Sequence, residues 1–189
     1  MAFGLEFLVP LCCVGIILLG IIGFVVMIYN RLVTLRNRVN NAWAQIDVQL
    51  KRRYDLIPNL METVKGYMNH ERETLESVTR ARAMLATGSV ADKAQADNML
   101  TSTLKTLFSV AESYPQLKAN ENFKMLQEEL AGTENKISYI RTAYNDSVLE
   151  YNTAIELFPN SLLAAPLGFK PSDYFKVDEA VREAPKVKF

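Results

Sequence analysis

The sequence predicts an all-α protein, in which a single N-terminal transmembrane helix continues into an antiparallel up-and-down bundle of about four helices. Two observations lead to this prediction. Residues 7–28 carry no charge, and from residue 29 to residue 158 the apolar residues recur at helical spacing, with almost no strand signal. After residue 158 four prolines forbid a continuous helix, so we expect an irregular C-terminal segment.

Residues 7–28 are expected to cross a membrane, preceded by a short tail of residues 1–6. At about 1.5 Å per residue this apolar run extends roughly 33 Å, which is close to the hydrocarbon thickness of a bilayer. A cleaved signal peptide is not favoured, because the run is long, no basic region precedes it and no small-residue cleavage site follows it. The lipid bilayer is therefore the first expected partner.

The charges that flank this span predict its orientation. Glu6 precedes the span, whereas Arg31, Arg36 and Arg38 follow it before the first acidic residue, Asp47. Because positively charged flanks stay on the cytoplasmic side, we predict a single-pass protein with its short N-terminus outside and its C-terminal domain in the cytoplasm.

Residues 29–158 are predicted to form the bundle. No glycine or proline interrupts the chain from Phe24 to Ile57, so the membrane helix is expected to run without a joint into the first bundle helix. At Pro58 a proline removes one backbone donor and presses against the carbonyl of Tyr54, so we expect a helix break or kink there. The predicted number of four helices counts the segments before and after Pro58 as two helices. Along the first stripe, apolar residues repeat every eleven positions, as Leu35, Ile46, Ile57 and Met68.

Two turns divide the rest of the bundle, near residues 87–91 and 114–120. The first contains a glycine that ends a helix and a serine that caps the next, with an aspartate three residues later. The second begins where a helix ends before a proline, and an asparagine caps the helix that follows. The residues on which these turns depend are Gly88, Ser89, Asp92, Pro115 and Asn120.

Residues 159–189 are rich in proline but too apolar for a free tail. We expect this segment to fold back on the bundle or to dock on a neighbouring subunit, and the sequence leaves both alternatives open. Residues 183–189 are expected to fray.

Composition argues against several classes of function. Lysine plus arginine and aspartate plus glutamate balance at 21 each, so nucleic acid is not expected as a partner. Cys12 and Cys13 are adjacent and His70 is the single histidine, so neither a disulfide framework nor a metal site is expected. The sequence holds no phosphate-binding glycine loop and no nucleophile elbow. We therefore predict a protein that is not an enzyme and has no cofactor.

Several motifs occur in the order typical of one family. They are RRYDLIPNL at residues 52–60, YPQLKANENF at residues 114–123, and the Tyr-Asn pairs Tyr144 with Asn145 and Tyr151 with Asn152. With these motifs the chain resembles the LemA family over about residues 29–175. The resemblance implies a bacterial inner-membrane protein with one span and an antiparallel helical bundle, and it implies no established biochemical activity.

Polar residues that lie close to the apolar stripes predict a structural polar layer inside the bundle. Its candidate members are Gln49, Arg53, Glu134, Arg141, Asn145 and Asn152. One interpretation is a buried, mutually satisfied network that fixes helix register. The alternative is a ligand pocket or proton-handling site around Gln49, Arg53 and Arg141. We favour the structural interpretation.

These observations together predict a non-enzymatic, membrane-anchored helical scaffold or adaptor. A continuous helix from the span into the bundle suits a homo-oligomer, or binding to another membrane protein, because a fixed orientation lowers the entropic cost of further contacts. The alternative function is a ligand-sensing or enzymatic bundle that uses the polar layer.

Overall fold

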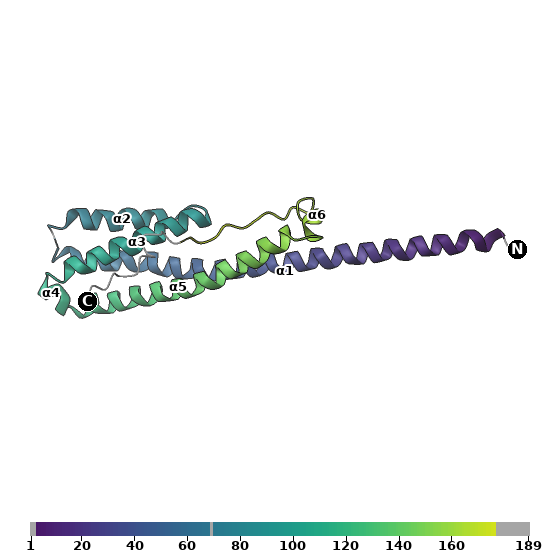
Figure 1. The fold of residues 1–189 in the computed structure, drawn as a ribbon. Coiled ribbons are helices and arrows are strands. Elements are labelled where there is room, and N and C mark those ends of the chain that lie inside the picture. The colour runs from purple at the N-terminus through teal and green to yellow at the C-terminus, as the bar shows by residue number, and fades with distance from the viewer. Residues whose placement is uncertain (1–2, 69, 177–189) are drawn as a thin grey trace, which may run out of the picture. The chain divides into compact units, whose positions relative to one another are not determined.

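The computed structural model describes the chain over residues 3–68 and 70–176, with side chains from residue 14 onward (Figure 1). The regular elements of these residues are all helices, which confirms the all-α class. They are α1 (Phe3–Lys65), α2 (Arg72–Leu85), α3 (Val90–Ala111), α4 (Pro115–Ala119), α5 (Glu121–Glu156) and α6 (Asn160–Ala164).

The chain divides into two compact units. The first comprises Met1–Asn40 with Ser147–Ser172, and the second comprises Asn41–Asp146 with Asp173–Phe189. Helices α1 and α5 each contribute residues to both units.

In the first unit, α1 changes character at Ile28. Between Val14 and Met27 its large apolar side chains are exposed, apart from the half-buried Val25. From Ile28 onward α1 has a buried stripe, and α5 has a buried stripe of its own. The buried residues are Ile28, Leu32, Leu35 and Val39 on α1, and Val148, Tyr151, Ala154 and Ile155 on α5. Within the described residues, α1 is the one helix long and apolar enough to cross a membrane by length and composition.

The core of the second unit is built from α1, α2, α3 and α5. Helices α2 and α3 lie against each other as a hairpin (Figure 1). All four members of the eleven-residue repeat, Leu35, Ile46, Ile57 and Met68, are buried in their respective units, as the spacing predicts.

Helix α1 continues through Pro58 to Lys65, so of the break or kink expected at Pro58 the break is not present. The chain turns instead between Lys65 and Arg72. The sequence concealed the true turn because buried apolar residues keep helical spacing across it, as Val64 and Met68 do. Among the described residues four longer helices are present, α1, α2, α3 and α5, and α1 ends about two turns after Pro58.

The structure also shows how α1 tolerates this proline. Pro58 has no N–H, so it leaves the carbonyl of Tyr54 without its helical donor. Arg82 of α2 replaces that donor, because its Nε donates a hydrogen bond to the Tyr54 carbonyl at 3.0 Å. The same guanidinium lies over the Tyr54 ring, 3.8 Å from the ring centroid. The missing backbone bond thus becomes a contact between α1 and α2.

Both predicted helix caps are present. Ser89 accepts a hydrogen bond from the Asp92 amide, and the Asp92 side chain accepts one from the Ser89 amide, which forms a capping box at α3. The preceding Gly88 has a positive φ of 119°. At the second turn Asn120 accepts a hydrogen bond from the Phe123 amide at 3.1 Å and caps α5. The short helix α4 lies within this turn, where only irregular chain was expected.

Candidate functional site

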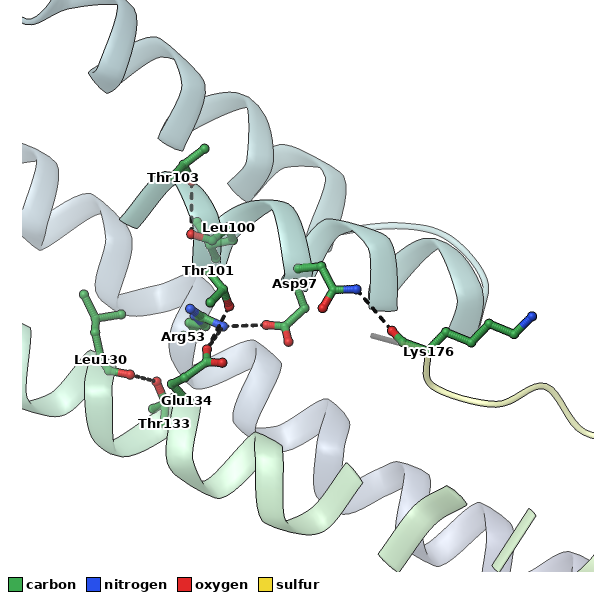
Figure 2. A network of polar contacts seen from close by, with 10 residues as sticks. Arg53, Asp97, Leu100, Thr101, Thr103, Leu130, Thr133, Glu134 and Lys176 are labelled. Atoms are coloured by element: carbon green, nitrogen blue, oxygen red, sulfur yellow. Dashed lines mark hydrogen bonds and ion pairs between the residues drawn. The ribbon is translucent and has the colours of Figure 1, made fainter. Parts of the chain in front are cut away.

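A buried ionic cluster links three helices of the second unit (Figure 2). Arg53 of α1 is only 2% exposed, and its Nη1 donates to Asp97 of α3 at 2.7 Å. The same nitrogen lies 2.6 Å from Glu134 of α5, which also accepts a hydrogen bond from Thr101 at 2.8 Å. We refer to Arg53, Asp97, Thr101 and Glu134 as the Arg53 cluster.

The electrostatics of the Arg53 cluster depend on how deeply each carboxylate is buried. Asp97 is 2% exposed, and this burial raises the pKa of its carboxyl above the ordinary value, with a further increase from the charge of Glu134. The positive charges of Arg53 and Arg141 act in the opposite direction. The side chain of Glu134 is one-third exposed, so water reaches the cluster at that end.

Two of the six residues predicted for the polar layer belong to the Arg53 cluster, namely Arg53 and Glu134. Gln49 does not join them, and its Oε1 is buried without a hydrogen-bond partner among the described residues. Arg141 donates instead to Ser138 at 3.4 Å and affects Asp97 through its charge. The three residues of the ligand-site alternative, Gln49, Arg53 and Arg141, are therefore not joined by hydrogen bonds in the part of the chain that the structure describes.

The sequence reasoning did not include Asp97 and Thr101. A signal for both was present, because they share a helix face with the buried Leu100 and Leu104 at spacings of three and four residues. An acidic residue on the apolar face of a helix requires a cationic partner, and Arg53 is that partner.

In the second unit Asn145 holds the C-terminal segment, which differs from its predicted place in the polar layer. Its side-chain amide donates to the carbonyl of Phe175 at 3.1 Å and accepts from the Phe175 amide at 2.9 Å. The neighbouring Tyr144 hydroxyl donates to the Asp173 carbonyl at 2.7 Å. Phe175 is fully buried, and the Trp43 ring lies 6.2 Å from its ring and 5.7 Å from that of Tyr144.

In the first unit Asn152 repeats this arrangement, which likewise differs from its predicted place in the polar layer. It donates to the Ser172 carbonyl at 3.0 Å and accepts from the Ser172 amide at 2.9 Å, while Tyr151 donates to the Lys170 carbonyl at 2.9 Å. A side-chain amide has the same donor and acceptor pair as a peptide group, so it satisfies an extended chain that has no strand partner.

The two Tyr-Asn pairs explain where the C-terminal segment goes. Of the two alternatives left open by the sequence, residues 170–176 fold back on α5 of their own chain. The predicted fraying of residues 183–189 lies outside the described residues. Within the described residues no group of three or more histidine, cysteine, aspartate or glutamate side chains is arranged to hold a metal ion.

The fold and the site together define a class of protein, an all-helical chain with one long apolar N-terminal helix and a C-terminal segment held by paired tyrosines and asparagines. The LemA family model matches residues 42–189. The chain is 30% identical over 174 residues to Protein LemA of Metamycoplasma hominis, a match that covers 88% of this chain and 78% of the relative. This chain belongs to the LemA family.

Two further relatives carry a different name. Magnetosome protein MamQ of Magnetospirillum gryphiswaldense is 25% identical over 191 residues, covering 85% of this chain and 70% of the relative. Magnetosome protein MamQ 2 of Paramagnetospirillum magneticum is 24% identical over 188 residues, covering 84% and 69%. The family membership and the apolar part of α1 indicate a membrane-associated protein of a family whose biochemical function is not established.

Proposed function

We propose that this LemA family protein is a membrane-anchored, non-enzymatic helical scaffold that self-assembles in the bilayer. The continuity of α1 is the observation that carries the proposal. The helix that exposes apolar side chains over residues 14–27 also supplies buried core residues to the first unit from Ile28 and to the second unit from Ile46. An anchor that shares its helix with the core restricts how copies meet, which lowers the entropic cost of each further contact.

The Arg53 cluster supports a structural role over catalysis. Arg53 makes ion pairs with two carboxylates of its own chain, and Glu134 also accepts from Thr101. A group that already has short contacts to its own chain gains little from a ligand that must displace them. The ligand-sensing alternative has less support, because Gln49 and Arg141 are not bonded to Arg53.

For orientation we propose that the helical part after residue 28 lies in the cytoplasm, by the charges of Arg31, Arg36 and Arg38. We further propose that the membrane is the inner membrane of a bacterial cell, with the residues before the span on its outer side. Another membrane protein that binds the scaffold is compatible with this topology.

The mass of the protein in mild detergent tests self-assembly. Light scattering that separates the protein mass from the detergent mass is expected to give a multiple of the 21.3 kDa of one chain. Chemical crosslinking in native membranes before extraction is expected to give a ladder of the same multiples. A protein mass of 21.3 kDa, together with no homotypic crosslinked species in the membrane, would overturn the proposal.

Copurification after that crosslinking distinguishes a homo-oligomer from an adaptor. Bands that contain only this chain support self-assembly, whereas a second membrane protein in constant ratio, with no homotypic product, supports the adaptor function instead.

A further inference from the structure

An uncharged, apolar segment connects α5 to the C-terminal segment in the first unit. Residues 157–169 contain no charged residue, and they lie between Glu156 and Lys170. Several of their large apolar side chains are exposed, with Leu157 at 57% and Phe158 at 79%. We refer to Leu157, Phe158, Leu162 and Leu167 as the α6 surface. An apolar cluster of this kind in a folded protein marks a contact with a partner or a membrane.

The segment that presents the α6 surface is itself well packed. Asn160 is buried and donates to the Ala154 carbonyl at 2.8 Å, and Ala164 and Phe169 are buried as well. The Leu157 amide donates to the Thr153 carbonyl at 3.0 Å, so the helical bonding of α5 reaches this point. The exposure of the α6 surface is thus a feature of an ordered segment.

The segment that carries the α6 surface belongs to the same unit as the candidate membrane span, and α6 lies on the side of α1 within that unit (Figure 1). The Phe169 ring packs edge-on against the ring of Tyr29, with 5.8 Å between the ring centroids, and the Arg36 guanidinium lies over the Phe169 ring, 5.1 Å from its centroid. Tyr29 directly follows the uncharged run that ends at Ile28. If this run crosses the bilayer, as the proposed function holds, then Phe169 lies at the level where the hydrocarbon ends.

The residues around this level have the chemistry of a membrane interface. Tyrosine and basic side chains favour the headgroup region, where an aromatic ring has an apolar body and a polar end. Tyr29 contacts the segment through Phe169, Lys170 follows the segment directly in sequence, and Arg31 lies two residues after Tyr29; all three are exposed, so they can face phosphate groups.

We propose that the α6 surface inserts into the headgroup and acyl-chain boundary of the same leaflet from which α1 emerges, as a second membrane contact. This inference rests on the proposed anchoring by α1. The occupant is lipid, because the segment is uncharged, is bordered by basic and aromatic residues, and is attached through Phe169 to Tyr29, directly after the apolar run of α1. Interfacial segments of this kind bury their apolar face about 5–10 Å into the boundary.

Nitroxide labels measured in lipid nanodiscs test this contact. In a Cys12→Ala/Cys13→Ala background, single labels are placed at Leu157→Cys and Leu162→Cys, in nanodiscs of phosphatidylcholine with phosphatidylglycerol. Collision with oxygen, which concentrates in hydrocarbon, is compared with collision with a water-soluble nickel chelate. Leu149→Cys is the matched control. Like Leu157, Leu149 is 57% exposed, but it lies on α5 eight residues earlier, about 12 Å from Leu157 along the helix axis.

The inference predicts an oxygen-to-nickel collision ratio several-fold higher at positions 157 and 162 than at position 149. Ratios equal to that of the control would overturn it. Low collision with both reagents at positions 157 and 162, with spin–spin broadening, would assign the α6 surface to a second copy of the chain and also overturn it. Circular dichroism checks that each labelled protein retains its helix content, and the two positions give independent readings.

A label at Ile22→Cys separates this inference from the anchoring on which it rests. Ile22 is exposed in the middle of the apolar stretch. A high oxygen-to-nickel ratio at position 22 with control-like ratios at positions 157 and 162 rejects the α6 contact alone. A low ratio at position 22 rejects the anchoring itself.

Discussion

Arg53→Met should destabilise the protein strongly, because it removes the cation from a cluster that stays buried. Asp97, 2% exposed, would lose its 2.7 Å contact and remain as a carboxylate in the core. Breaking a buried pair by removing one partner costs about 3–5 kcal/mol. For a chain of this length each kcal/mol lowers the melting temperature by about 2–4 °C, so a decrease of about 6–20 °C is expected.

The neighbouring Arg52 provides the matched control. Arg52 is 3.4 Å from Glu129, and both side chains are well exposed, at 49% and 41%. The same substitution there, Arg52→Met, should cost less than about 1 kcal/mol, because exposed ion pairs contribute little. Thermal unfolding of the two variants in the same detergent, followed by circular dichroism, gives the comparison. An Arg53→Met protein as stable as Arg52→Met, or more stable than the native chain, would refute the structural interpretation and favour a ligand site.

The pH dependence of the same variant gives an independent check. Burial raises the pKa of Asp97, and Arg53 is the strongest influence that lowers it. Removing Arg53 should therefore raise the pKa of Asp97 further. A carboxyl whose native pKa is raised contributes most stability when protonated and loses it as the pH rises through that pKa. Both proteins lose stability alike as the pH rises from the ordinary carboxyl pKa of about 3.9 to the raised pKa of Asp97 in the native chain, so the difference in stability between them should widen only above that raised pKa. Adding Asp97→Asn to Arg53→Met should remove this pH dependence, because no titrating group is then left at position 97. A difference in stability between native chain and Arg53→Met that becomes smaller as the pH rises would contradict the reasoning.

Three further predictions follow from single contacts. Arg82→Ala should lower the free energy of unfolding by about 1.5–3 kcal/mol more in the native chain than in a Pro58→Ala background, because alanine at position 58 can itself donate to the Tyr54 carbonyl. If a double-mutant cycle gives the same loss of stability in both backgrounds, the Arg82 bond to Tyr54 is not the cause. Burial, with the charge of Asp173, raises the pKa of Tyr144 to about 12, so the stability it contributes below pH about 10 should be lost as the pH rises through about 12. The difference between the tyrosinate absorbance titrations of the native chain and of Tyr144→Phe reports the ionisation of Tyr144 and should have its midpoint near pH 12. A midpoint near the ordinary tyrosine pKa of about 10 would contradict the burial of Tyr144. Asn152→Ala should accelerate hydrogen exchange over residues 170–172, and unchanged exchange there would exclude the side-chain amide as the holder of this segment.

Local rules predicted the parts of this fold that depend on neighbours in sequence. The capping residues Ser89 and Asn120 satisfy amides three residues away, so the sequence alone specifies them. The buried repeat of α1 follows from helical geometry in the same way.

The reversal at residues 66–71 was not predicted because apolar spacing reports burial and not direction. Val64 and Met68 are both buried, and a stripe that continues in register across a turn resembles a single helix. A break or kink was expected at Pro58, because nothing near the proline in sequence indicates that Arg82, 28 positions after Tyr54, replaces the donor that Tyr54 loses.

The polar residues were predicted least well because their partners are distant in sequence. Arg53 meets Asp97 across 44 positions, and Asp97 lies on α3, from which no member of the polar layer was predicted. Asn145 and Asn152 lie near the apolar stripe of α5, as expected, but pair with backbone groups, and backbone groups carry no sequence signal.

Hydrogen–deuterium exchange of the full chain in lipid nanodiscs tests most directly whether one unbroken helix joins the proposed membrane span to the helical core. The amides of residues 28–35 lie at this junction, within α1. An unbroken α1 predicts that they exchange as slowly as the amides of the buried stretch around Ile46. Rapid exchange confined to residues 28–35, at the rate of an unstructured peptide, would place a hinge there and contradict the account.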